Sequence, residues 1–304
     1  MQQAIQKAVL QTYGEEPETI EPLGGGFYGR VFLISINKAP FPVVVKGYLF
    51  PGLAAKEAEQ IKTLSAYSLL KMPEVYHVLE KDKTGFSNDL LFMEALRGIN
   101  AGFLDVSTLP DGARKRICEQ IVDNLIAFHS VVNPKGFGDL SADSFSQSWQ
   151  DCYVKEAEII VRKAKILFDK GQISETVLSV FEESIRKFNR IFDRPITKAR
   201  LIHGDYNTWN IMLDPEKTCA VAVIDPFGCR WADSEFDLYQ LDNANGKAYG
   251  LLKRYAEKVP LSENFEKKRR FYELYTEINH YYDANITVNA KAAETMAEKL
   301  KEVL

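Results

Sequence analysis

The most informative part of the chain reads Leu201-Ile-His-Gly-Asp-Tyr-Asn-Thr-Trp-Asn-Ile-Met-Leu213 and is followed by the apolar run Ala220-Val-Ala-Val-Ile224, which ends in Asp225. A short polar segment with Asp, Pro and Lys separates the two apolar stretches, so the pattern predicts a β-hairpin. The hairpin would bring Asp225 back beside Asn210. A carboxylate and an amide oxygen would then lie around one small volume.

These residue types, in this order, indicate phosphoryl transfer. In kinase-type chemistry a loop Asp accepts the proton of the acceptor hydroxyl, a loop Asn holds one Mg²⁺, and a later Asp at a strand end holds the bridging Mg²⁺. Asp205, Asn210 and Asp225 fit those three roles. A lone His-Gly-Asp is more often a turn, but the positions of Asn210 and Asp225 after it favour the catalytic interpretation. We expect His203 to orient the loop and Asp237 to cap a helix or anchor the loop.

The same motifs carry a family resemblance. His203-Gly-Asp-x-x-x-x-Asn210 with Ile224-Asp225 resembles the signature of the aminoglycoside phosphotransferase and choline kinase superfamily. Asp233-Ser-Glu-Phe-Asp237-Leu238 is similar to the Asp-Leu pair that opens the following helix there. The resemblance implies an α+β, two-lobed, protein-kinase-like fold, with ATP and Mg²⁺ as cofactors and a small-molecule hydroxyl as the acceptor.

A kinase fold also needs phosphate-covering glycines upstream. Leu23-Gly24-Gly25-Gly26-Phe27-Tyr28-Gly29-Arg30 precedes an alternating, β-branched run over 31–36 that predicts a strand. We expect the segment Gly24, Gly25, Gly26 and Phe27 to cover the nucleotide phosphates. A plain hairpin turn is the alternative, because a glycine-rich turn alone is weak evidence.

A lysine on a strand and a glutamate on a helix follow in the required order. The apolar run 41–45 ends in Lys46, which could pair the nucleotide phosphates. In the predicted helix 54–65, Glu57 shares a face with Ile61 and Leu64. A carboxylate on a buried face needs a partner, and the resemblance to the family's pattern of a strand lysine followed by a helix glutamate implies that this partner is Lys46. Alternatively, Glu57 only complements the helix dipole.

The run Asp89-Leu-Leu-Phe-Met93-Glu94-Ala95-Leu96-Arg97-Gly98 reads as a strand that enters a connection between two lobes. We expect adenine to bind main-chain groups near Glu94 to Leu96 and to contact Met93; an ordinary core strand is the alternative. The lobes would span 1–97, which binds the nucleotide, and 98–304, which is mostly helical and carries the catalytic loop, the metal site and the acceptor pocket.

Helical periodicity predicts the remaining elements. The expected helices cover 1–13, 113–131, 149–164, 173–192, 239–255, 262–282 and 290–303. We expect the mixed charges of Glu266-Lys-Lys-Arg-Arg270 to form a solvated helix face, with an anion-binding patch as the alternative. We expect His129 and Cys229 to be structural residues.

Composition limits the class of protein. The chain has 304 residues, 46% of them hydrophobic and 26% charged, with a formal charge of −4, so no basic surface for nucleic acid is indicated. No apolar stretch is long enough to span a bilayer, and the segment from Met1 lacks a signal-peptide pattern. Four cysteines without Cys-x-x-Cys spacing argue against zinc or disulfides. We expect a cytoplasmic monomer or homodimer.

The acceptor is constrained less tightly. The short interval between Asp225 and Asp237 has no room for a protein kinase's activation segment, which favours a small molecule. Candidate contacts are the aromatic residues Trp209, Trp231, Tyr275, Tyr281 and Tyr282, with core packing as the alternative for each. The acidic residues Asp233, Glu235 and Asp283 would suit a polycationic aminoglycoside.

Ile224-Asp225-Pro226 is also similar to fructosamine kinases, but their loop usually reads Gly-Asp-Leu-Trp/His-Ser-Gly-Asn, and this chain lacks the second glycine. An aminoglycoside-type acceptor is therefore the first expectation, and a ketosamine or choline-type metabolite is the alternative. A catalytically inactive, nucleotide-binding pseudokinase is the alternative of another class. Preference for ATP or GTP stays open.

Overall fold

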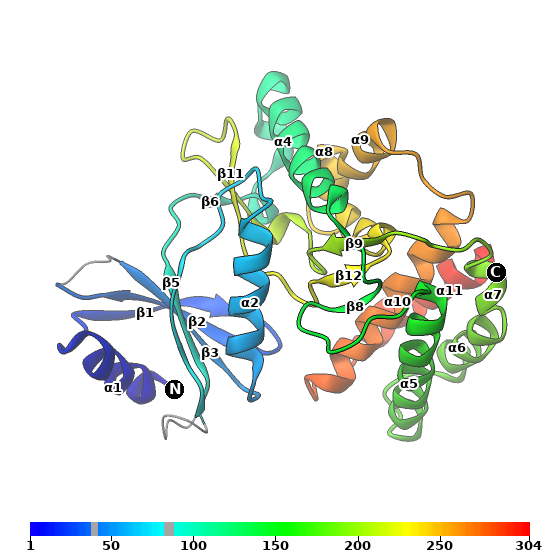
Figure 1. Cartoon of the computed structure of the whole chain (residues 1–304), viewed down its shortest axis with the longest axis horizontal. Coiled ribbons are helices and arrows are strands. Elements are labelled where there is room, and N and C mark those ends of the chain that lie inside the picture. Colours follow the sequence, from blue (N-terminus) through cyan, green and yellow to red (C-terminus); the bar gives the residue numbers. More distant parts are fainter. Residues whose placement is uncertain (38–41, 82–87) are drawn as a thin grey trace.

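A computed structural model describes residues 1–37, 42–81 and 88–304, and its fold is α+β, as predicted. An antiparallel sheet with two helices forms one lobe, and most of the other helices form the second (Figure 1). No helix in the described part of the chain combines the length and apolarity that crossing a bilayer would require. The lobe boundary near residue 97 stays a prediction.

Five antiparallel strands form the N-terminal sheet. Their spatial order is β1 (Thr19–Gly25), β2 (Gly29–Ser35), β3 (Val43–Tyr48), β5 (Leu90–Glu94) and β4 (Val75–Leu79). Helix α1 (Gln2–Tyr13), which ends at Gly14 as predicted, covers one face, and α2 (Leu53–Ser65) covers the other.

Alternation along β3 decides where Lys46 points. Val43 and Val45 pack with the α1 face, whereas Val44 and Tyr48 pack with the α2 face. Because strand side chains alternate between faces, Lys46 points toward α2. Phe41, the first residue of the run expected to lead into Lys46, lies outside the described residues.

The catalytic segment lies in two small sheets of the second lobe. In one, the predicted hairpin is confirmed: β10 (Ile211–Leu213) pairs with β11 (Ala220–Val223) and also with β6 (Ile99–Asn100). The other has the order β7 (Val132–Asn133), β9 (Ala199–Ile202), β12 (Arg230–Ala232) and β8 (Gly138–Asp139).

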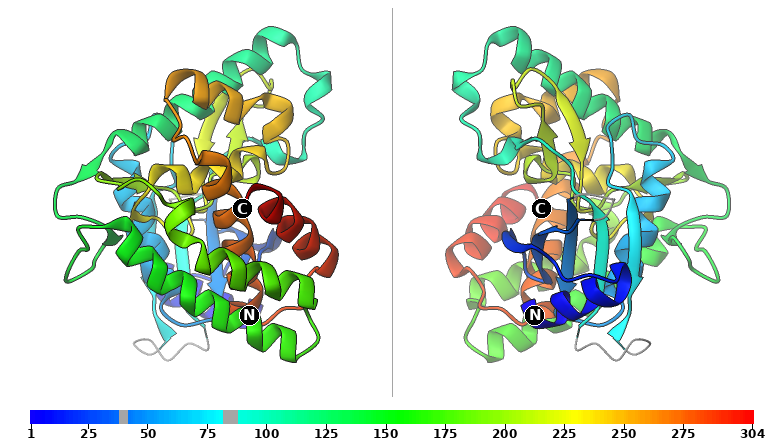
Figure 2. Two further views of the ribbon diagram at one scale, coloured as in Figure 1. Left: turned by 90° about the vertical axis from the view of Figure 1, so that its right-hand side faces the viewer. Right: turned by 90° about the vertical axis from the view of Figure 1, so that its left-hand side faces the viewer.

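Helices surround these sheets. They are α4 (Asp111–Ser130), α5 (Trp149–Asp169), α6 (Glu175–Arg186), α7 (Phe188–Ile191), α10 (Phe265–Asp283) and α11 (Ala290–Val303), with short 3₁₀ turns η1 (Ala101–Phe103), η2 (Val106–Thr108) and η3 (Thr208–Asn210). Figure 2 shows α10, in orange, running through the helical lobe with α11, in red, beside it.

The single helix predicted over 239–255 is wrong. The chain instead forms the 3₁₀ segment η4 (Ser234–Asp242), then α8 (Gly246–Tyr249) and α9 (Leu251–Lys258). Gly250, between α8 and α9, has a φ of 79°, a left-handed conformation that ends one helix and begins the next. Seven consecutive residues of η4, 235–241, are buried, so tertiary packing rather than a one-sided apolar pattern sets its conformation.

The solvated face expected at Glu266-Lys-Lys-Arg-Arg270 is also wrong. The Lys268 side chain is only 6% exposed, and its Nζ lies 2.7 Å from Asp233 Oδ2 and 2.8 Å from Glu235 Oε2. Helix α10 packs against η4, and this contact turns Lys268 inward. The buried ammonium and its two carboxylates satisfy one another.

Replacing Lys268 by Ala should lower the free energy of unfolding by about 3–5 kcal/mol, because it leaves two buried carboxylates without their cation. Urea unfolding followed by circular dichroism measures the change. Lys267→Ala is the matched control, since no ion pair of the described residues involves Lys267. Equal stability of the two variants would contradict the assignment of a structural ion cluster.

Candidate active site

Lys46 joins the two lobes through carboxylates. Its Nζ lies 2.7 Å from Glu57 Oε2 and also contacts Asp225 Oδ1. Burial lowers the pKa of Lys46, but Asp225 and Glu57 raise it by more, so the ammonium stays charged. The predicted Lys46–Glu57 pair is confirmed. The sequence analysis missed Tyr48, whose hydroxyl donates to Glu57 Oε2 at 2.7 Å; its spacing of two from Lys46 was the available signal.

The carboxylate of Asp205 lies among amide donors. Oδ2 accepts from Asn210 Nδ2 at 2.9 Å, and Oδ1 accepts from Asn207 Nδ2 at 2.7 Å and from Gln240 Nε2 at 2.8 Å. Burial, followed by the charge of Asp225, raises the pKa of Asp205 to about 7 against the opposing effect of the amides. Asn207 and Gln240 are further residues that the sequence analysis missed.

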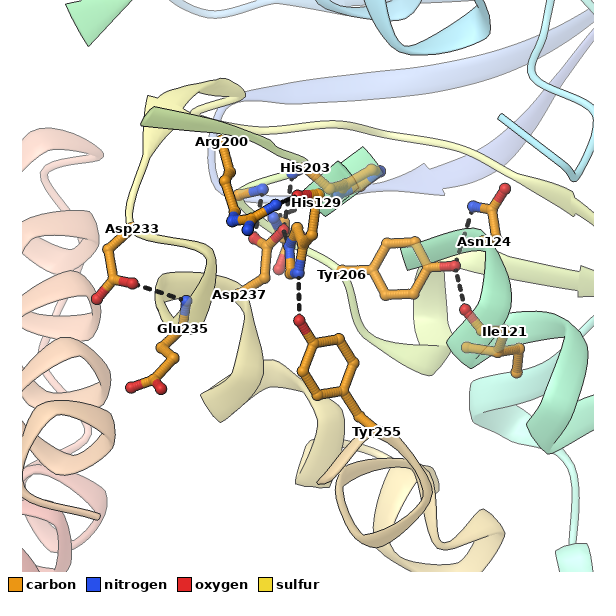
Figure 3. Close-up of polar contacts among 12 residues, drawn as sticks. Ile121, Asn124, His129, Arg200, His203, Tyr206, Asp233, Glu235, Asp237 and Tyr255 are labelled. Atoms are coloured by element: carbon orange, nitrogen blue, oxygen red, sulfur yellow. Dashed lines mark hydrogen bonds and ion pairs between the residues drawn. The ribbon is translucent and has the colours of Figure 1, made fainter. Parts of the chain in front are cut away.

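Asp237 anchors the start of the catalytic loop, as predicted. Its fully buried carboxylate accepts from the backbone N–H groups of His203 at 2.8 Å and Gly204 at 2.7 Å (Figure 3). His129 Nε2 lies 3.1 Å from the same carboxylate, and His129 Nδ1 lies 2.8 Å from the Tyr255 hydroxyl. His129 is therefore a structural residue, as expected.

His203 orients the loop rather than contacting the open site. Its imidazole is fully buried, and this burial lowers its pKa to about 4. Nδ1 accepts the backbone N–H of Asp205 at 3.3 Å. The next residue, Tyr206, fixes the loop to α4 by donating to the carbonyl of Ile121 at 2.8 Å (Figure 3).

The turn that carries Asp225 lies directly against the catalytic loop. The N–H of Ile224 donates to the carbonyl of Asn210 at 2.9 Å, so the hairpin brings Asp225 beside Asn210. Asp225 has a φ of 56°, a strained value for a residue with a side chain. Gly204, at φ 86°, approaches this turn so closely that an added Cβ would lie 2.0 Å from the carbonyl oxygen of Phe227.

The donor set fits a hard divalent cation. Asn210 uses Nδ2 to donate to the backbone carbonyl of Asp205 at 2.8 Å and to its carboxylate, and no described residue donates to its Oδ1. The Asp225 side chain is 45% exposed. Carboxylate and amide oxygens, completed by phosphate oxygens and water, suit Mg²⁺.

Close contacts join the two strands of the glycine-rich hairpin. An added Cβ at Gly25 would lie 2.5 Å from the carbonyl oxygen of Gly29, so the two strands approach too closely for a side chain. Arg30 Nη1 donates to the carbonyls of Gly26 at 3.0 Å and Gly29 at 2.9 Å. These contacts join the two sides of the hairpin at its tip.

Aromatic rings connect the tip of this hairpin with the turn that follows Asp225 and with α10. The Tyr28 ring stacks on Phe227 with centroids 4.6 Å apart, and His280 lies edge-on to both. Phe27 is 44% exposed, with its ring 6.3 Å from that of Tyr281. The predicted phosphate-covering segment therefore leans on the helical lobe.

At the expected hinge, Met93 is buried on the α2 side of the sheet, and Leu96 follows β5. The N–H of Glu94 already donates to the carbonyl of Glu74 at 2.8 Å, and its side chain contacts Lys71. The Glu94 N–H is thus not free to bind adenine, and the main chain at Leu96 becomes the better candidate.

A cavity of about 370 Å³ lies beside the catalytic loop. Gly204 and Phe227 line it on one side, and Asp139, Glu156 and Asp283 contribute carboxylates. The other lining residues include Tyr28, Phe50, Lys56, Arg230, Thr276, Asn279 and His280.

Two acidic residues expected at the acceptor site are not available there, because Asp233 and Glu235 are buried against Lys268. Asp283 lines the cavity, although it also pairs with Lys163 at 2.6 Å. Tyr275 is fully buried in the core, which is the alternative given for it in the sequence analysis. Of the acceptor candidates, then, the structure places Asp283 at the cavity.

Solved structures confirm the fold. An inferred fructosamine-3-kinase from Haemophilus somnus aligns with a TM-score of 0.71 and 18% identity over 100% of this chain and 98% of that one. A thermostable mutant of the aminoglycoside phosphotransferase APH(4)-Ia, in a ternary complex with AMP-PNP and hygromycin B, aligns with a TM-score of 0.72 and 14% identity over 99% and 97%.

The chain belongs to the fructosamine kinase family, whose sequence profile matches residues 1–302. It is therefore a kinase-like phosphotransferase whose acceptor is a hydroxyl group of a small molecule. A protein-ribulosamine 3-kinase of Oryza sativa subsp. indica is 23% identical over 86% of this chain and 73% of its own length. Escherichia coli YcbJ, an uncharacterized protein, is 24% identical over 79% and 78%.

Trp209 stands at the position where the family loop usually has its second glycine, and its φ is not positive. Its ring lies against Gly102 of η1, where an added Cβ would be 2.3 Å from the indole. Gly102 is therefore needed for the close approach of η1 to this loop.

Gly204→Ala should destabilise the protein by about 2–5 kcal/mol, since it adds left-handed strain and a clash with the backbone of the Asp225 turn. Gly228→Ala is the matched control: Gly228 has a φ of 76°, but an added Cβ meets nothing within 4 Å. It should cost only about 1–2 kcal/mol. Denaturant unfolding compares the two variants, and equal losses would show that the close approach is unimportant.

Proposed function

We propose that this protein transfers the γ-phosphoryl group of ATP, with Mg²⁺, to a hydroxyl of a ketosamine, a sugar linked to an amine. The main support is the convergence of Lys46, Asp205, Asn210 and Asp225 from two lobes onto one volume. Family membership supports the choice of a ketosamine.

The residues fit the nucleotide and the metal. Lys46, oriented by Glu57 and Tyr48, would bind phosphate oxygens, and Asn210 and Asp225 would hold Mg²⁺. Backbone groups of Gly24, Gly25 and Gly26, shielded by Phe27, would cover the phosphates, while Met93 and the main chain at Leu96 would contact adenine. Bound Mg²⁺ would supply neutralisation of the charge that builds up on the phosphates.

Asp205 would position the acceptor hydroxyl and take its proton. As the acceptor oxygen bonds to the γ-phosphorus, the bond from phosphorus to the β–γ bridging oxygen breaks, and that oxygen keeps the electron pair as ADP leaves. A base whose pKa is raised toward neutrality by burial suits this role. Positioning and charge stabilisation would supply most of the rate enhancement.

The cavity supports an acceptor that carries an amine. Glu156 and Asp283 pair with Arg230 and Lys163, whereas no described cation lies within ion-pair distance of Asp139. The stacked rings of Tyr28 and Phe227 offer a flat wall for a sugar. An aminoglycoside or a choline-type amine shares the amine chemistry and is the second candidate.

For partners and location, the only basis is the charge and composition of the sequence. We therefore keep three predictions from it: the protein is a monomer or homodimer, it is cytoplasmic, and it has no nucleic-acid partner.

An ADP-release assay with MgATP tests the acceptor class. Ribulosyl-lysine and fructosyl-lysine should give at least tenfold higher kcat/KM than kanamycin, hygromycin B, choline, ethanolamine or methylthioribose. A clear preference for an aminoglycoside would overturn the ketosamine assignment. Normal ATP binding with no ADP release for any acceptor would instead favour the pseudokinase.

Asp205→Ala should lower kcat by about 10²-fold or more, as expected for loss of a general base, with little change in MgATP affinity.

Asp225→Ala should show the opposite pattern, a weakened affinity for MgATP in titration calorimetry, because it removes a metal ligand. Unchanged turnover in the first variant, or unchanged affinity in the second, would reject the corresponding role.

A further inference from the structure

The two oxygens of the Asp205 carboxylate are not equivalent. A carboxylate has about four lone-pair positions, two on each oxygen. Oδ1 accepts two amide N–H groups, from Asn207 and Gln240, whereas Oδ2 accepts one, from Asn210. Within the described chain, the remaining open position is therefore on Oδ2.

Gln240 reaches this carboxylate from a distant part of the sequence. It lies in η4, 35 residues after Asp205, and is only 6% exposed. Its Oε1 accepts from Asn243 Nδ2 at 2.6 Å, and its Nε2 also donates to the Tyr239 hydroxyl at 3.0 Å. The opposite amide orientation would place an oxygen 2.8 Å from a carboxylate oxygen, which is repulsive, so the network fixes Nε2 toward Asp205.

We propose that Gln240 is a positioning residue for the transfer reaction: together with Asn207 it occupies Oδ1 of Asp205 and leaves Oδ2 to receive the proton of the acceptor hydroxyl. The inference rests on the proposed function, in which Asp205 is the base. Gln240 acts through Asp205 and needs no contact with the acceptor or the nucleotide.

Loss of the Gln240 donor would open a second direction from which the acceptor hydroxyl could approach Asp205. Without Gln240, Asp205 keeps one donor on each oxygen, from Asn207 and Asn210. Each oxygen then has one open position, and the hydroxyl proton can approach either of them. Only one approach fits the fixed phosphoryl group, and small misplacements of reacting atoms lower rates strongly.

The test is a double-mutant cycle between Gln240→Met and Asp205→Ala. Methionine keeps the length and volume of glutamine but cannot donate. ADP release is measured with MgATP and saturating ribulosyl-lysine, and also with MgATP and water alone. Gln240→Met should lower kcat by roughly tenfold with an unchanged KM for ATP. The double variant should be no slower than Asp205→Ala, because residues that act through one group are not additive.

Two further variants keep the test decisive. Gln240→Glu retains the shape and can still accept from Asn243, but places a carboxylate against Asp205, so it should lose at least as much activity as Gln240→Met. Gln150→Met is the matched control, because Gln150 also uses both ends of its amide, toward backbone groups of Arg194 and Ile196. It should leave kcat unchanged. Thermal unfolding and binding of an ATP analogue verify that each variant is folded.

The outcomes separate the two levels of inference. Loss of activity in Asp205→Ala with full activity in folded Gln240→Met would overturn the positioning role alone, as would additive effects of the two substitutions. Full activity of Asp205→Ala, or no ADP release by the wild type in either assay, would overturn the proposed function and this inference with it.

Discussion

One buried carboxylate sets the geometry of the active site. Asp237 accepts the backbone N–H groups of His203 and Gly204 and fixes the start of the catalytic loop against η4. Because Gly204 lies against the backbone of Phe227, the same anchor fixes the turn that carries Asp225. The loop that carries Asp205 and Asn210 and the turn that carries Asp225 are thus held together by buried contacts to their backbones.

Charge balance connects this frame with the N-terminal sheet. Lys46 contacts one carboxylate from its own lobe, Glu57, and one from the other lobe, Asp225. The three groups together carry one net negative charge, and an ionised Asp205 nearby adds a second. Such a cluster would suit the proposed Mg²⁺ and nucleotide, because the cation would offset the negative charge of the carboxylates and the ammonium of Lys46 would offset that of the phosphates.

The surroundings of Asp205 contain amides in place of the charged groups that surround Lys46. Neutral amides surround Asp205, so they orient its carboxylate without adding a positive charge that would lower its basicity as strongly as an ammonium would. The adjoining cavity combines stacked aromatic rings with carboxylates from β8, α5 and α10. The amides around Asp205 and the residues that line the cavity are therefore different sets of side chains, and the cavity takes residues from both lobes.

The sequence alone was sufficient for the hairpin and for the strand and helix that carry Lys46 and Glu57, because these depend on local periodicity and spacing. The class of fold followed from the resemblance of its motifs to a known superfamily. Contacts between distant segments decided the rest. Lys268 looks solvated in a run of charges and is buried only because α10 packs on η4. Gln240 has no local signal, since its role comes from a bond across 35 residues. Side-chain burial and amide direction are set by packing partners, which a one-dimensional pattern does not contain.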